Sequence, residues 1–79
     1  MIRGAQTRTG IHVGDTVLIR FTSSEIKAVV VEDRGPLGRD GSRIWRVRPA
    51  EGKMVEEYYI PPTEYEVPEE LLTVIDPAK

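Results

Sequence analysis

The chain has 79 residues and a formal net charge of −2 at pH 7, with 39% hydrophobic and 30% charged residues. This length suits one small domain, and the composition is that of a folded protein rather than a disordered one. The lack of cysteine excludes disulfides and thiolate metal sites, and the single histidine, His12, offers little to a histidine-based catalytic or metal site. With no long apolar run, we expect no membrane span, no signal peptide and a cytoplasmic location.

Charge is distributed unevenly along the chain. Residues 1–48 carry nine basic and five acidic side chains, whereas residues 49–79 carry two basic and eight acidic ones. Two interpretations stay open: neighbouring strands that neutralise each other, or a surface that binds nucleic acid or a charged protein. A pI near 5.4 argues against a dedicated nucleic-acid binder, because such domains are usually basic.

The two ends of the chain differ in pattern from its middle. Residues 1–10 are polar and show no hydrophobic period, which predicts a flexible N-terminal arm. Residues 77–79 read as a short tail. We therefore expect one domain over residues 11–76.

The first two predicted strands follow a turn signal at residues 14–15. Residues 16–21 alternate in the strand period, which places three side chains toward the core: Val17, Ile19 and Phe21. Residues 26–32 centre on three consecutive valines, and β-branched side chains favour a strand over a helix.

A glycine-rich loop and a third strand come next. Residues 33–42 contain three glycines and a proline, which predicts a long, exposed and mobile loop suited to function. In the strand predicted at residues 43–48, alternation directs Trp45 and Val47 to the core. We expect Val30, from the valine-rich strand, to be buried with them. Arg46 and Arg48 must then lie on the outer face.

The second half predicts two further strands separated by a helical turn. Residues 54–60 read as a fourth strand that ends at a Pro-Pro pair. Residues 68–71, with proline first and two glutamates after it, fit a single helical turn. Residues 72–75 read as a closing strand. Because no segment predicts a longer helix, the fold class is all-β, a small barrel or curled sheet of about five strands.

The order of these motifs resembles an SH3-like small barrel. It comprises Gly-Asp before the first strand, a valine-rich strand, a glycine-rich loop, two strands, and then Val-Pro-Glu-Glu-Leu-Leu. The resemblance covers roughly residues 13–75 and implies a fold rather than a function. Type II dihydrofolate reductases share this pattern, but Glu56 and Glu57 stand where those enzymes have Gln and Ile. KOW-type modules share it too, but the chain lacks their basic glycine-centred turn.

The candidate binding residues are basic and aromatic. Arginines on the loop and on the third strand could meet an anionic partner, and exposed aromatic side chains often anchor protein contacts. Trp45 has two interpretations, as a core residue or as part of a ligand groove. The candidates are Arg34, Arg39, Trp45, Arg46, Arg48, Tyr58 and Tyr59.

The outer-face arginines need compensation if no anionic partner covers them. Because Arg46 and Arg48 lie two residues apart on one face, their guanidinium groups repel each other. We expect carboxylates from the acidic second half beside them, chiefly from residues 54–60, where Glu56 and Glu57 are the nearest candidates.

Three functions compete at this point. The leading hypothesis is a non-enzymatic module that docks on a protein partner or larger assembly through an arginine and aromatic surface. The second is a nucleic-acid-binding barrel that uses its arginine-rich strand. The third is an enzyme whose site forms only at the centre of an oligomer. The sequence indicates no catalytic residue, metal ligand or cofactor, and it leaves the oligomeric state open.

Overall fold

The computed structural model describes residues 10–22 and 24–78, which build an all-β fold. The sequence prediction of this fold class is confirmed, and so is the helical turn before the last strand. In chain order the elements are β1 (Thr16–Arg20), β2 (Glu25–Gly35), the 3-10 turn η2 (Arg39–Gly41), β3 (Ile44–Pro49), β4 (Lys53–Val55), β5 (Tyr58–Ile60), β6 (Tyr65–Pro68), the 3-10 turn η3 (Glu69–Leu71) and β7 (Leu72–Asp76).

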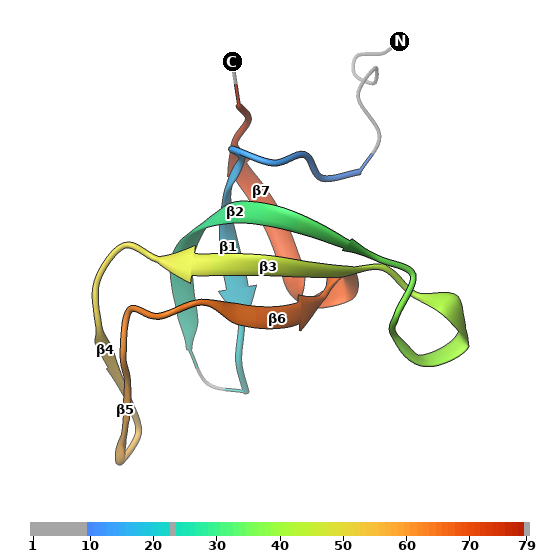
Figure 1. Ribbon diagram of the computed structural model, residues 1–79. Coiled ribbons are helices and arrows are strands. Elements are labelled where there is room, and N and C mark those ends of the chain that lie inside the picture. The colour runs from blue at the N-terminus through green and yellow to red at the C-terminus, as the bar shows by residue number, and fades with distance from the viewer. Residues whose placement is uncertain (1–9, 23, 79) are drawn as a thin grey trace, which may run out of the picture.

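Five strands form a curled antiparallel sheet in the order β6-β3-β2-β1-β7 (Figure 1). The expectation of a barrel is corrected in one respect, because the described sheet does not close. No ladder joins its two edge strands, β6 and β7, among the described residues. The chain passes directly from β6 to β7 through the three residues of η3, so a corner of the chain connects the two edges.

The concave side of this sheet holds the core. Five residues predicted to be buried are at most 4% exposed: Val17, Ile19, Val30, Trp45 and Val47. Ile11, Ile26, Ala28 and Val67 complete the buried cluster. Phe21 faces the same side as Ile19, as predicted, because both line one apolar pocket, but its side chain is 37% exposed. β1 ends at Arg20, so Phe21 lies past the ladder, at the end of the sheet.

The predicted fourth strand over residues 54–60 is a hairpin. The chain reverses at Glu56 and Glu57, and Glu56 has a positive φ of 56°. β4 and β5 then pair with each other in a separate two-stranded sheet, which projects from the body of the molecule in Figure 1. As a result β3 pairs with β6, which follows the hairpin, rather than with the strand next to it in sequence.

A buried carboxylate connects the beginning and the end of the described chain. Asp15 is fully buried and accepts hydrogen bonds from the backbone N–H of His12, at 2.8 Å, and of Ala78, at 2.7 Å. The Asp15 backbone also bonds to Val30 on β2. These contacts hold the segment before β1 against the segment after β7, so we call them the Asp15 clasp.

Candidate functional site

The outer face of β3 carries a ladder of alternating charges. Arg46 lies directly opposite Glu32 on β2 and Glu66 on β6 in the strand registers. Its guanidinium nitrogens lie 3.5 Å from Glu32 Oε1 and 3.1 Å from Glu66 Oε2. A third carboxylate, that of Glu64, lies 3.7 Å away. Arg46 therefore meets carboxylates from both neighbouring strands.

Two further arginines belong to the same array. Arg48 pairs with Glu64, and Arg34 lies 3.1 Å from both Glu32 and Glu66. We call this array the charge ladder; it consists of Arg34, Arg46, Arg48, Glu32, Glu64 and Glu66. The prediction that acids of the second half lie beside Arg46 and Arg48 is confirmed. The strand named for them is wrong, because Glu56 and Glu57 form the hairpin turn and β6 is the neighbour of β3.

The charge ladder is electrically balanced. The pKa of Arg46 is raised, chiefly by its hydrogen bond to Glu66 and further by the charges of Glu32, Glu66 and Glu64. Three guanidinium groups face three carboxylates, so the surface offers little net positive charge to a phosphate. The observed neighbours thus favour mutual neutralisation over anion binding on this face.

Trp45 belongs to the core, and its edge also lines a hollow beside Asp33, Arg43 and Glu69. It is 4% exposed, and its indole Nε1 donates a 2.8 Å hydrogen bond to Glu69 Oε1 in η3. The Arg43 guanidinium lies 5.9 Å from the centre of its ring. Burial and these two contacts favour the interpretation of Trp45 as a core residue.

Arg43 also fixes the end of the glycine-rich loop. Its Nη1 lies 2.7 and 2.8 Å from the two carboxylate oxygens of Asp33. The pKa of Asp33 is lowered, mostly by the hydrogen bond that the Gly35 backbone N–H donates to it and then by Arg43. A single ion pair, between Asp33 and Arg43, therefore joins the two ends of the loop.

The loop itself is exposed, as predicted, and reaches out from the sheet (Figure 1). Backbone hydrogen bonds within it link Gly38 to Ser42 and Gly41 to Gly38. Arg39 lies exposed in η2, and Leu37 is 67% exposed. The mobility of this loop stays a prediction.

The β4–β5 hairpin exposes three large side chains. Tyr58 is 71% exposed, Tyr59 60% and Met54 58%. Met54 pairs with Tyr59 across the ladder and Val55 pairs with Tyr58, so the two tyrosines lie on opposite faces of the hairpin. The face of Val55 and Tyr58 turns toward the body, because Val55 and Ile60 pack against the core.

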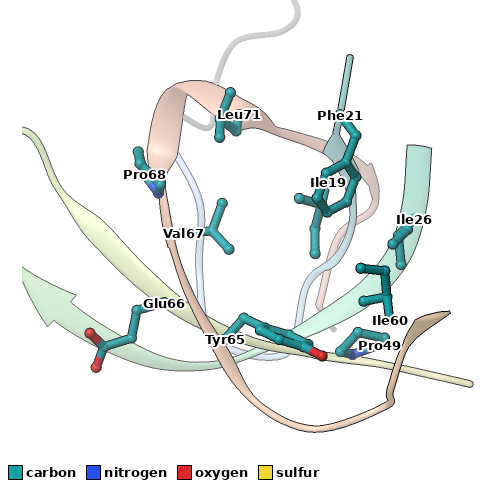
Figure 2. Close-up of a pocket in the computed structure, with 10 residues that line it drawn as sticks. All are labelled: Ile19, Phe21, Ile26, Pro49, Ile60, Tyr65, Glu66, Val67, Pro68 and Leu71. Carbon is teal, nitrogen blue, oxygen red and sulfur yellow. The ribbon is translucent and has the colours of Figure 1, made fainter. Parts of the chain in front are cut away.

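An apolar pocket of about 250 Å³ opens at the end of the curled sheet, close to the hairpin. The side chains drawn in Figure 2 surround its opening, and the Glu66 carboxylate points away from it. Tyr65 lies in its wall, and the Tyr65 hydroxyl donates a hydrogen bond to the Pro61 carbonyl. The lining residues are Ile19, Phe21, Ile26, Pro49, Ile60, Tyr65, Glu66, Val67, Pro68 and Leu71.

The sequence did not point to this pocket. Its residues come from β1, β2, β3, β5, β6 and η3, which the curl of the sheet brings together. Phe21 was assigned to the core on alternation alone. A wall built from so many distant segments has no local spacing motif.

Sites for other chemistry are not apparent in the part of the chain that the structure describes. Within residues 10–22 and 24–78, no three potential metal ligands lie close enough together to hold an ion. No helix of this part is long and apolar enough to cross a membrane.

Comparison with protein-family models, with curated protein sequences and with solved structures finds no match to this chain. The case for a function therefore depends on the residues described above.

Proposed function

We propose that this protein is a non-enzymatic module that docks on a protein partner, with the β4–β5 hairpin and the adjoining apolar pocket as its contact surface. The observation that carries the proposal is the exposure of Met54, Tyr58 and Tyr59 on one projecting hairpin. Tyrosine and methionine are enriched in the centres of protein interfaces, and tyrosine supplies a large contact area at small conformational cost.

The charge ladder supports this choice over nucleic-acid binding. Arg34, Arg46 and Arg48 each have carboxylates of the same chain as neighbours. A phosphate would have to compete with those carboxylates, which lowers the gain from counterion release. The arginine face is the site of the alternative function, nucleic-acid binding.

The fold that we propose is SH3-like, in the form of a curled sheet that, over the described residues, stays open between β6 and β7. The η3 turn immediately before β7 supports it, since the resemblance implies a single helical turn at this position. Small barrels of this kind serve many functions, so the fold agrees with docking without selecting it.

The proposal is tested by purifying the tagged protein from its own cells and rebuilding any complex from purified parts. We expect one protein partner that binds wild-type protein and the Leu37→Ser control, but binds the Met54→Ser/Tyr59→Ser or Tyr58→Ser variants at least about tenfold more weakly. Leu37 is a matched control because it is as exposed as the tyrosines but lies in the glycine-rich loop.

A titration with short duplex and single-stranded DNA and RNA tests the alternative. Binding that survives about 0.2 M salt and is lost in Arg46→Ala/Arg48→Ala would overturn protein docking in favour of nucleic acid.

A further inference from the structure

The apolar pocket continues along the inner face of the hairpin. A second hollow, of about 290 Å³, lies between the hairpin and the β1–β2 turn. Phe21 and Ile60 line both hollows, so the two are adjacent, and we call them together the groove, with Leu71 at one end and Tyr58 at the other. The second hollow is lined by Phe21, Thr22, Val55, Glu56, Tyr58 and Ile60.

The deep end of the groove has the size of one large apolar side chain. An apolar cavity of about 150 Å³ is known to stay dry and to accept benzene. The pocket here measures about 250 Å³, and its side chains are apolar apart from Glu66, which points outward, and the Tyr65 hydroxyl, which bonds to Pro61. It therefore suits an aromatic or long aliphatic side chain.

Contacts across the chain hold the walls of the groove in place. Lys53 Nζ donates a 2.8 Å hydrogen bond to the Glu25 carbonyl, which joins the base of the hairpin to β2. Arg20 Nη2 donates a 3.0 Å hydrogen bond to the Glu70 carbonyl, which joins the end of β1 to η3. A groove whose walls are fixed before binding loses less entropy when a partner enters.

The hairpin end of the groove carries acidic side chains, and the described chain as a whole has an acidic surplus. Once the charge ladder and the Arg43–Asp33 pair are set aside, residues 10–78 keep four basic and nine acidic side chains. Glu56 lines the groove, and Glu57 is the next residue in the hairpin turn. No basic side chain lines either hollow. The two glutamates at the hairpin turn and the absence of a basic side chain from the lining favour a positively charged partner at this end of the groove.

We propose that the groove receives a protein segment in which one large apolar side chain is flanked by lysine or arginine. The apolar side chain enters the 250 Å³ pocket, past Phe21 and Ile60, and the basic residues lie toward Glu57 and the acidic rim. This inference rests on the proposed docking function and adds the chemistry of the partner.

Selection from a displayed library of random peptides of about a dozen residues tests the partner chemistry. We expect enriched peptides to combine an aromatic or long aliphatic residue with lysine or arginine. Their affinity for Phe21→Ser should fall by about tenfold or more, while Leu37→Ser binds like wild type. If Phe21→Ser does not fold, as judged by circular dichroism, Tyr58→Ser replaces it, because Tyr58 is 71% exposed and lines the same groove.

A charge reversal tests the acidic rim separately. Glu57→Lys should weaken the selected peptides severalfold and reduce the salt dependence of their binding. Asp40→Lys is the matched control, because it makes the same change in net charge in the distant η2 turn.

Three outcomes would overturn the inference: no enrichment, enrichment of acidic peptides, or binding that tolerates both Phe21→Ser and Tyr58→Ser. Peptides that lose binding only in Met54→Ser/Tyr59→Ser would place the contact on the outer face of the hairpin. The docking function would then stand and the groove assignment would fall. If no peptide is enriched and no protein complex can be rebuilt from purified parts, the groove assignment and the docking function are both rejected.

Discussion

The Trp45 indole donates its N–H to Glu69, so the only tryptophan of the chain connects the middle of β3 to the η3 corner, 24 residues away. The hydrogen bond is 2.8 Å long and lies at the edge of the core. Both edge strands of the sheet meet at this corner. A contact between a core side chain and the corner therefore stabilises the position of β6 relative to β7.

Removal of the Glu69 carboxylate should be costly. Glu69→Ala leaves the indole N–H buried without an acceptor, which costs about 1–3 kcal/mol. Urea denaturation followed by tryptophan fluorescence measures the loss. Glu70→Ala is the matched control, since Glu70 is the exposed neighbour and engages Arg20 through its backbone carbonyl alone. Equal stability of the two variants would contradict this role for Glu69.

The Asp15 clasp should contribute strongly to stability. Asp15→Ala removes the acceptor of two part-buried hydrogen bonds, from the backbone amides of His12 and Ala78, at about 0.5–1.5 kcal/mol for each. Amide exchange at Val30 should also speed up, because its N–H bonds to the Asp15 carbonyl. Asp76→Ala is the comparison at an exposed aspartate. A melting temperature equal to that of Asp76→Ala would show that the clasp is dispensable.

The charge ladder should contribute little to stability in spite of its many contacts. Exposed ion pairs gain little because water and salt screen them and because ordering long side chains costs entropy. We expect Arg46→Ala/Arg48→Ala to unfold at nearly the wild-type urea concentration. Val47→Ala, which removes a fully buried side chain between them, should lower the midpoint clearly. A similar loss in both variants would indicate that the ladder is structural.

Acid should weaken the ion pair at the base of the glycine-rich loop. Because the pKa of Asp33 is lowered in the folded protein, its ionised form stabilises the fold. That contribution is complete above about pH 4 and is lost as pH falls through the lowered pKa. Between pH 5 and 2, wild-type protein should therefore lose more stability than Asp33→Asn does. Parallel pH profiles for the two proteins would contradict the assignment.

Sequence reasoning succeeded where burial follows local alternation. The period-two pattern in β1 and β3 located Val17, Ile19, Trp45 and Val47, because side chains on a paired strand must alternate between the two faces. At Phe21, one residue beyond the ladder, the rule gave the side but not the burial, since this side chain is 37% exposed. Alternation is a property of paired strands, so it cannot say where pairing ends.

The hairpin was missed because its turn has an unusual sequence. Two-residue hairpin turns normally use Asn-Gly or Asp-Gly, which adopt positive φ at low cost. Here Glu56 adopts that conformation, and the flanking residues read as one strand. The error carried over to the charge ladder, because the true partner of β3 lies beyond the hairpin. The groove depends on the same long-range strand pairing, so its position could not be predicted from the sequence either.

The Asp15 clasp determines where the chain can be relinked and where a support or a second protein can be attached. It brings the segment at His12 beside Ala78, and in Figure 1 both ends lie on the side of the sheet away from the β4–β5 hairpin. A circular permutant that links His12 to Ala78 directly through a short linker, with new termini at Gly41 in the exposed loop, should thus be tolerated. By the same geometry, a solid support or a fluorescent protein attached at Ala78 leaves the hairpin facing solvent.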